Sequence, residues 1–234
     1  MPSRRPRLLS AAAAVLALPF TMAASGRCGL MQDFTETYLY PEKIDRIVLV
    51  TGDGNIDAVA YEREGVFIRR HSFGFLRSFV DPVSNLEGTT LSLQVDCEIE
   101  GNCQYDHMME LPFGIEMDIT MSHALMDVGY FDSPLTLTFE TGYFYGVRLA
   151  IPELTITADD IEVDAEFAVA PEAVTIELTA GDVVLELPAG AYQCNLDAGP
   201  GEVTLDGITC DEAATSVLDV QIRKGTITVT GVAP

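Results

Sequence analysis

The chain has 234 residues, of which 48% are hydrophobic and none is tryptophan. That content is ample for a hydrophobic core and argues against general disorder. The 13 Lys and Arg residues are far outnumbered by 36 Asp and Glu residues, so the net charge is −23. A surface of this sign repels nucleic-acid phosphates and anionic lipid headgroups, and the composition therefore disfavours nucleic-acid binding.

Residues 1–25 have the pattern of an export signal peptide. Arg4, Arg5 and Arg7 form a basic start, an alanine-rich apolar run follows, and small residues suit cleavage after Ser25. Ser3-Arg4-Arg5 also resembles part of a twin-arginine signal, so either export route stays open, as does a short membrane anchor. The pattern predicts an exported protein of the periplasm, the cell surface or the extracellular space.

Five cysteines in an exported protein predict disulfide bonds. Cys97 and Cys103 bracket a Gly-Asn turn, which predicts a local hairpin closed by a disulfide. Cys194 and Cys210 lie one repeat apart and are expected to join neighbouring turns of the chain. Cys28 is left over, and lipidation, a free thiol and an intermolecular bond all remain open for it.

Residues 26–43 are mixed in character and are expected to form an extended tether. From residue 44 onward, alternating segments are separated by glycine corners, and the parity of the apolar positions changes at each corner. Ile47 comes before the Gly-Asp-Gly corner of residues 52–54 at an odd position, and Ile56 follows it at an even one. Side chains alternate faces along a strand, so this change keeps both apolar sets on one interior if the chain bends there.

The same phrase recurs in residues 174–187, 192–205 and 218–229. Each copy is an alternating strand, a glycine corner and a second alternating strand. Further corners give an irregular series, predicted at Thr51, Met121, Thr141, Thr157, Thr179, Ala198 and Arg223. No long segment has helical periodicity. Residues 44–231 are therefore predicted to form one all-β domain, an irregular, single-stranded β-helix-like β-solenoid with glycine-rich corners; an antiparallel β-sandwich is the alternative.

The scarce basic residues are concentrated near one segment, residues 66–80. Four arginines and a histidine there are interleaved with phenylalanines: Arg63, Arg69, Arg70, His71 and Arg77 with Phe67, Phe73, Phe75 and Phe79. This cluster could meet an acidic partner. A solvated face that neutralises nearby carboxylates is the commoner interpretation of such a cluster.

Residues 106–126 contain two histidines and five methionines. His107, His123 and the thioethers could ligate Cu(I), which prefers soft ligands. Met117 and Met121, however, share the parity of the neighbouring isoleucines. This parity predicts that they fill the core as adaptable apolar side chains.

The motif Leu187-Pro-Ala-Gly-Ala-Tyr192 and the flanking Gly181-Asp182-Val183 and Gly201-Glu202-Val203 resemble the bacterial putative-adhesin domain family. Leu111-Pro-Phe-Gly114 supplies a second turn of the same kind, and the resemblance covers about residues 44–231. It implies an envelope-associated β-solenoid of unknown function, a surface scaffold without catalytic residues. Residues 198–203 and 224–227 lack the aspartate of the family's Thr-Gly-Ser-Gly-Asp-Val phrase, so these corners are expected to be held differently.

The sequence contains no Gly-x-Ser-x-Gly, His-Glu-x-x-His or Cys-x-x-Cys motif. We therefore predict a non-enzymatic exported cell-envelope β-repeat protein, an adhesin or surface scaffold with an unknown envelope or surface partner. No catalytic residue, cofactor site or metal site is assigned. A polysaccharide-binding or polysaccharide-cleaving β-helix is the alternative, for which Tyr143 and Tyr145 are ambiguous sugar-stacking candidates.

Two further expectations concern the acidic residues and the end of the repeats. Asp159, Asp160, Glu162 and Asp164 are close in sequence and could hold Ca²⁺ as a structural ion, although an ordinary strand also explains them. A final turn of the solenoid, or rung, near Val229 would leave an unpaired strand edge if nothing covers it, and whether it is covered stays open. Such an edge predicts self-association through a terminal rung.

Overall fold

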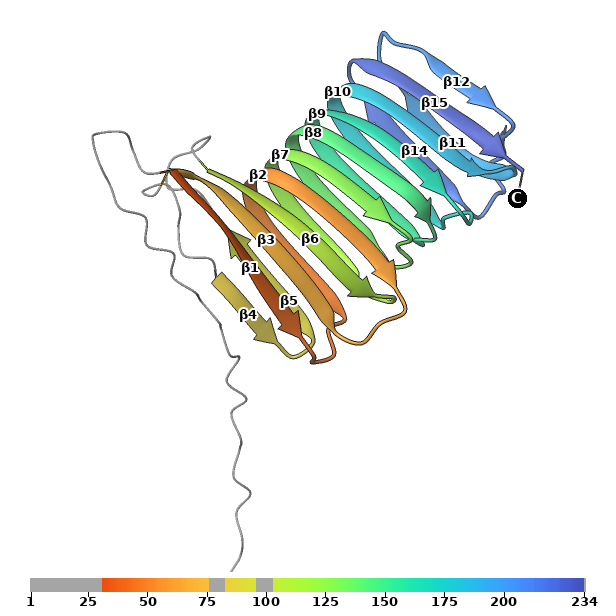
Figure 1. The fold of residues 1–234 in the computed structure, drawn as a ribbon. Helices are drawn as coiled ribbons and strands as arrows, with labels where there is room; N and C mark the ends of the chain where they lie inside the picture. Colours follow the sequence, from red (N-terminus) through yellow and green to blue (C-terminus); the bar gives the residue numbers. More distant parts are fainter. Residues whose placement is uncertain (1–30, 76–82, 96–102, 234) are drawn as a thin grey trace, which may run out of the picture.

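The computed structural model describes residues 31–75, 83–95 and 103–233, and these residues form an all-β fold (Figure 1). They contain 15 strands in one mixed sheet that is not closed. The described residues form no helix, and hence none that could cross a membrane. The strands are β1 (Met31–Tyr40), β2 (Arg46–Tyr61), β3 (Val66–Phe75), β4 (Val83–Glu87), β5 (Thr90–Val95), β6 (Cys103–Pro112), β7 (Glu116–Gly129), β8 (Leu135–Leu149), β9 (Glu153–Phe167), β10 (Ala173–Pro188), β11 (Ala191–Asp197), β12 (Val203–Asp206), β13 (Thr209–Cys210), β14 (Val217–Ile222) and β15 (Gly225–Val232).

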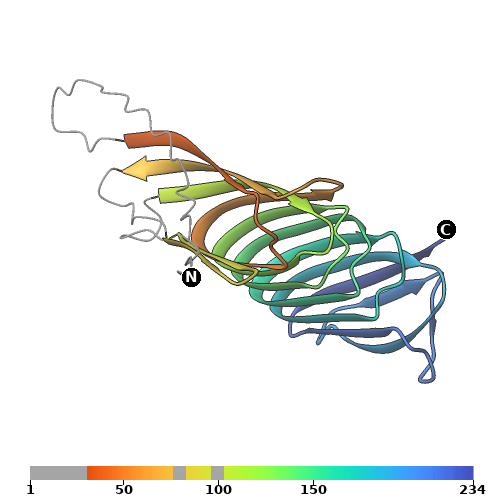
Figure 2. The same cartoon turned by 90° about the horizontal axis from the view of Figure 1, so that it is seen from below.

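Five long strands, β2, β7, β8, β9 and β10, each bend once at a corner. The bend divides each strand into a first arm and a second arm, and we call each bent strand a rung. Neighbouring rungs pair in parallel along both arms. Two further rungs consist of two strands each, β14 with β15 and β11 with β12. Figure 2 shows the rungs as nested curves stacked from β2 to the C-terminal strands.

The core lies inside the bends, and the parity of the buried residues changes at the corners as predicted. In β10, Val174, Ile176 and Leu178 of the first arm are buried, and so are Val183 and Leu185 of the second. Parallel register places buried apolar residues of the neighbouring rungs beside them. The apolar columns that result run along the whole stack, and their burial is the main source of stability at roughly 25 cal/mol per Å².

Glycine is required at the corners of β8 and β10 because a neighbouring rung approaches too closely there for a side chain. A Cβ added at Gly181 would overlap the carbonyl oxygen of Ile161, and one at Gly142 would overlap that of Ala124. Both glycines also have positive φ, 127° and 143°, a region that favours glycine. The corners predicted from the sequence are confirmed to within a few residues.

The spatial order of the rungs differs from their order in the chain at both ends. β5 and β6 follow β2 in the chain, but they pair with the first and second arms of β2 on the side opposite β7. At the other end, β14 and β15 lie between β10 and the earlier pair β11 and β12. The strand that contains Val229 is therefore paired on both sides. The edge near Val229 is covered, because the terminal rung is formed by β11 and β12.

At the N-terminal end, antiparallel strands cover both arms of the stack. β4 pairs with β5 on the first arm, and β3 followed by β1 extends the second arm from β6. Residues 31–40 of the expected tether thus form a strand of the sheet. β5 and β6, expected to form a hairpin, both run parallel to β2 and do not pair with each other. The hairpin expectation is wrong because β5 and β6 pair with different arms of β2.

Candidate functional site

A groove of about 790 Å³ crosses the rungs next to their corners, and we call it the corner groove. Its lining repeats from rung to rung because parallel pairing places equivalent residues side by side. One polar column consists of consecutive sheet partners that run from β8 to β11: Thr138, Thr157, Glu177, Gln221 and Asp197. The groove thus presents hydroxyl, carboxylate and amide groups at the spacing of the strands.

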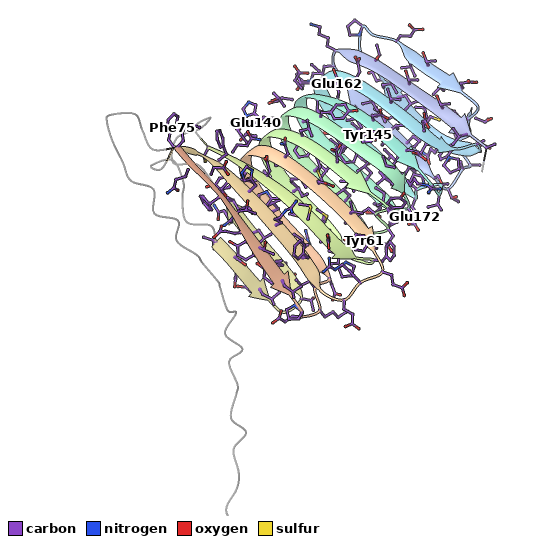
Figure 3. All side chains as sticks on the ribbon, in the orientation of Figure 1. Tyr61, Phe75, Glu140, Tyr145, Glu162 and Glu172 are labelled. Atoms are coloured by element: carbon purple, nitrogen blue, oxygen red, sulfur yellow. A yellow bond between two sulfur atoms is a disulfide. The ribbon has the colours of Figure 1, made fainter. Side chains whose placement is uncertain are left out.

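A second column lines the groove two residues further along each rung and includes Glu140, which is labelled in Figure 3. Its other members are Asp159, Thr179 and Arg223. The hydroxyl of Thr179 donates to a carboxylate oxygen of Asp159 over 3.4 Å, and this bond joins two neighbouring rungs. Between the two columns lie apolar residues: Phe139, Ala158, Leu178 and Ile222. The side chains of these four residues are buried in the core, so the corner groove presents two polar rows to solvent.

A smaller groove of about 300 Å³ shares Thr138, Phe139 and Glu140 with the corner groove and extends it toward β7, β2 and β5. Adjacent strands lie about 4.8 Å apart, so the column from Thr138 to Asp197 alone spans roughly 19 Å. This length fits an extended chain that lies across the strands. The residues that line the two grooves include no histidine or cysteine, and their chemistry suits recognition by hydrogen bonds and charge.

The outer face of the second arms carries a separate patch around two tyrosines of β8. The rings of Tyr143 and Tyr145 stack with their centroids 6.5 Å apart, and Tyr145 is labelled in Figure 3. Asp127 on β7 and Asp164 on β9 are the sheet partners of Tyr145. Burial, and then the charge of Asp164, raises the pKa of Tyr143. Burial, and then the charge of Asp57, raises the pKa of Asp127.

The candidate calcium ligands are divided between the two arms of β9. Asp159 lines the corner groove, whereas Glu162 and Asp164 lie on the second arm beside the two tyrosines of β8. Within the described ranges, no three His, Cys, Asp or Glu side chains gather closely enough to hold a metal ion. The structure therefore does not bring the four candidates together.

The candidate copper ligands lie on different strands and in different environments. His107 is buried on β6, whereas His123 is exposed at the corner of β7 and contacts Asp53 over 2.7 Å. Met117 and Met121 are almost completely buried, and their predicted place in the core is confirmed. The fold therefore does not bring the candidate copper ligands together in one site.

The basic cluster contacts carboxylates on the strands beside β3. Arg70 is buried on β3, forms an ion pair with Glu36 of β1, and donates to the hydroxyl of Tyr38 over 2.7 Å. Burial raises the pKa of Tyr38 to about 12. Arg63 forms an ion pair with Glu110 of β6. These arginines neutralise nearby carboxylates as expected, but Arg70 is buried and does not lie on the solvated face that was expected.

His71 is held between two strands by a pair of carboxylates. Its Nε2 lies 2.7 Å from Asp33 of β1, and its Nδ1 lies 3.6 Å from Asp106 of β6. The hydrogen bond with Asp33 is the main cause that raises the pKa of His71. Arg77 and Phe79 lie outside the described residues.

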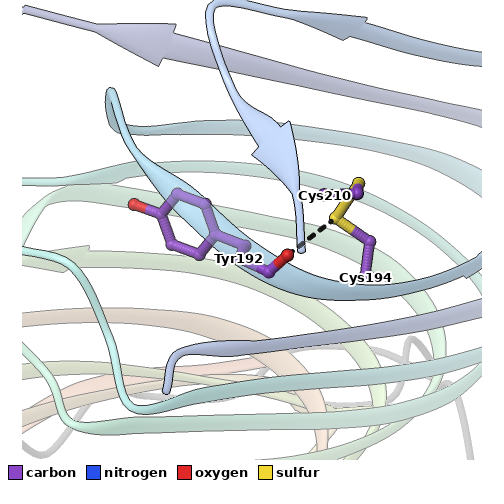
Figure 4. The surroundings of a disulfide bond; sticks show 3 residues. All are labelled: Tyr192, Cys194 and Cys210. Carbon is purple, nitrogen blue, oxygen red and sulfur yellow. Dashed lines mark hydrogen bonds between the residues drawn. A yellow bond between two sulfur atoms is a disulfide. The ribbon is translucent and has the colours of Figure 1, made fainter. Parts of the chain in front are cut away.

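The Cys194–Cys210 disulfide is present, as predicted (Figure 4). It joins β11 to β13, and Tyr192 lies next to it on β11, paired with Cys210. Cys28, Cys97 and the leader of residues 1–25 lie outside the described residues, so the Cys97–Cys103 bridge stays a prediction.

Sequence reasoning missed the corner groove. The sequence does contain part of the pattern. A polar residue comes directly before the last buried residue of several first arms, namely Thr138, Thr157 and Glu177. Their alignment into one row depends on the register between rungs. The tyrosine pair was noticed in the sequence, but its carboxylate neighbours come from other strands.

The fold resembles that of a putative cell adhesion protein from Clostridium sporogenes. The two chains are 13% identical, the match covers 86% of this chain and all of the other, and the TM-score is 0.51. A putative adhesin from Bacteroides fragilis matches over 86% of this chain and 97% of its own, with 11% identity and a TM-score of 0.43. Neither a protein-family model nor a curated protein sequence matches the chain. The resemblance to putative-adhesin proteins seen in the sequence is confirmed at the level of the fold.

Proposed function

We propose that the protein is an exported, non-enzymatic surface protein of the adhesin type that binds an extended ligand in the corner groove. The observation that supports the proposal most strongly is the polar column from Thr138 to Asp197. Each of five adjacent strands contributes one polar residue to it. Such a column offers similar hydrogen-bonding positions at a constant spacing. A chain of repeating units can use all of them at once, which raises affinity without a deep pocket.

We further propose that the rungs form an irregular β-solenoid and not a sandwich of two antiparallel sheets. The parallel, in-register pairing of both arms from β2 to β10 supports this architecture. Parallel strands require a connection that returns around the core, whereas a sandwich of antiparallel sheets uses hairpins. In a solenoid each rung repeats the surface of the rung before it, and the corner groove is then a direct product of the architecture.

Export to the bacterial envelope is supported by the leader pattern of residues 1–25 and by the Cys194–Cys210 disulfide. The test is fractionation of cells that express the protein with a C-terminal tag, together with protease shaving and mass analysis of its N-terminus. A chain cleaved after Ser25 and open to the protease on intact cells is the expected result. An uncleaved chain in the cytoplasmic fraction would contradict this part of the proposal.

The groove is tested on the immobilised mature protein with envelope polysaccharides and surface-protein extracts as probes. The variant E140Q/D159N/E177Q removes three groove carboxylates, and the control E116Q/E153Q/E186Q makes the same charge change at exposed positions outside the groove. We expect the groove variant to lose the retained probe and the control to keep it. Equal retention by both variants would remove the corner groove from the proposal.

Polysaccharide binding is the second candidate, and the half-exposed Tyr143 and Tyr145 favour it because aromatic rings can pack against sugar rings. We expect Y143A/Y145A to weaken glycan retention, whereas Tyr61→Ala, at an exposed tyrosine of β2, leaves it unchanged. Release of new reducing ends from a retained glycan would identify a polysaccharide-cleaving protein instead. Self-association through a terminal rung is the alternative use of the β12 edge, and sedimentation of the wild type and of a β12 variant tests it.

A further inference from the structure

β12 is an open edge of the sheet at the C-terminal end of the stack. In the part of the chain that the structure describes, β12 pairs only with β15. The carbonyl of Glu202 accepts a hydrogen bond from the Ile227 N–H over 2.9 Å. Backbone groups alternate sides along a strand, so Thr204 and Asp206 also turn theirs toward β15. Val203 and Leu205 turn their N–H and C=O groups to the open side.

The same two residues end the apolar column of the core, and in the described ranges no further strand covers their side chains on the outer side. Val203 is the sheet partner of Ile227, and Leu205 is the partner of Val229. Ile227 and Val229 are completely buried, whereas Val203 is 38% and Leu205 42% exposed. A strand added beside β12 would gain backbone hydrogen bonds and apolar burial at the same positions, as in known cases of β-strand addition.

On the first arm of the same rung, β13 and a disulfide cover only the start of β11. β13 pairs with the start of β11, and the Cys194–Cys210 disulfide fixes this contact. Cys194 and Leu196 on β11 are accordingly only partly exposed, and both pack against the core. Val203 and Leu205 are more exposed than these two residues, so the apolar positions most open to an added strand lie on β12.

The charges along β12 indicate what kind of strand fits. Glu202 and Asp206 flank the apolar pair, both are exposed, and neither forms an ion pair or a side-chain hydrogen bond among the described residues. If two copies paired antiparallel about Thr204, each Glu202 would face Asp206 of the other copy. Like charges directly opposite each other destabilise a sheet, so this register is unfavourable, and the net charge of −23 makes two copies repel in any register.

We propose that β12 is a docking edge for an extended, basic segment of another polypeptide. The segment adds as a strand, places apolar side chains beside Val203 and Leu205, and places Lys or Arg opposite Glu202 and Asp206. This inference does not depend on the corner groove. Fluorescence anisotropy of a labelled peptide with the core Lys-Val-Thr-Val-Lys, added to the mature protein, tests it directly.

The variants separate the backbone contribution from the charge contribution. L205P removes an outward N–H that β15 does not use, a place where an edge strand tolerates proline, and we expect at least about tenfold weaker binding. E202Q/D206N is expected to weaken binding roughly threefold to tenfold and to reduce its salt dependence. The control E116Q/E153Q and the groove variant E140Q/D159N/E177Q are expected to bind the peptide as the wild type does.

The peptide supplies a test that does not depend on how the variants fold. N-methylation of the backbone on the side that faces β12 is expected to abolish binding, and exchange of both lysines for glutamate is expected to do the same. Unchanged binding of the methylated peptide would overturn the proposal. A wild-type dimer in sedimentation that L205P converts to a monomer would assign the edge to a second copy and overturn it as well.

Discussion

The two ends of the stack are closed in different ways. At the N-terminal end, antiparallel strands cover both arms, and ion pairs such as Arg70 with Glu36 tie β1 to β3. At the C-terminal end, β13 and the Cys194–Cys210 disulfide cover only the start of one arm, while β12 on the other arm has no outer partner among the described residues. The comparison shows that an interior rung pairs its backbone groups with similar rungs on both sides. A rung at the end of the stack has such a neighbour on one side only, so its other backbone groups need different partners.

The largest expected effect on stability comes from truncating a buried leucine of the core column that contains Val229, compared with an exposed leucine of the same column. Leu185 of β10 and Leu205 of β12 both pair with Val229, but Leu185 is fully buried and Leu205 is 42% exposed. We expect Leu185→Ala to reduce the free energy of unfolding by about 4 kcal/mol and Leu205→Ala by about 1 kcal/mol. Urea unfolding of both variants measures the difference. Equal losses would mean that β12 is covered in solution.

Removal of Arg70 is expected to open the N-terminal end. Arg70→Ala leaves the Glu36 carboxylate without its buried partner, and we expect a loss of about 3 kcal/mol in the free energy of unfolding. Hydrogen exchange in β1 should rise more than in β14. Arg46→Ala is the control because its ion pair with Asp118 is largely exposed, and such pairs contribute at most about 1 kcal/mol. Similar losses in the two variants would contradict a special role of Arg70 at this end.

Removal of the disulfide is expected to weaken the C-terminal end by a similar or slightly smaller amount. Cys194 and Cys210 are 16 residues apart, and a bridge that closes a loop of this length contributes about 3 kcal/mol, in one model through the entropy of the unfolded chain. Urea unfolding of C194A/C210A measures the loss, and hydrogen exchange locates it in β11 and β13. Faster exchange in β1 than in β11 would place the effect at the wrong end.

Acid is expected to loosen the N-terminal end through His107. Burial, and then the charge of Arg70, lowers the pKa of His107 to about 4, so the unfolded chain binds a proton first when the pH falls below the ordinary value of 6.5. Its contribution to the free energy of unfolding should fall by about 2 kcal/mol between pH 7 and pH 5. The pKa of His71 is raised in the folded protein. Protonated His71 therefore stabilises the fold, and this stabilisation is lost as the pH rises through the raised pKa.

Unfolding at the two pH values compares the wild type with His107→Gln and with His123→Gln, an exposed histidine at a corner. The first variant should lose much of the acid sensitivity, and the second should keep it. If His107→Gln responds to pH as the wild type does, other groups control the acid response of this end.

Much of the interior was predictable because the rules that govern it are local. Alternation along a strand placed Val174 and Ile176 inside, and a change of parity located the corner near Gly181. The burial of Arg70 was not predictable in this way. An arginine on a strand usually faces solvent, and its partner Glu36 is 34 residues away in the chain. The corner groove is a similar case, since its polar row exists only when Thr138, Thr157 and Glu177 come into register.

The sequence by itself determined the all-β class, the inward and outward faces of the arms, the positions of the corners and the cysteine pair that closes β11 on β13. The tertiary structure alone decided the order of the rungs, the strands that cover each end and the edge that stays open. The physical reason is that the rungs share one apolar pattern. The pattern determines which side chains face the core, but it does not distinguish one neighbouring rung from another. That choice depends on connections and on pairing between residues far apart in the chain, as the place of β14 and β15 between β10 and the earlier strands β11 and β12 shows.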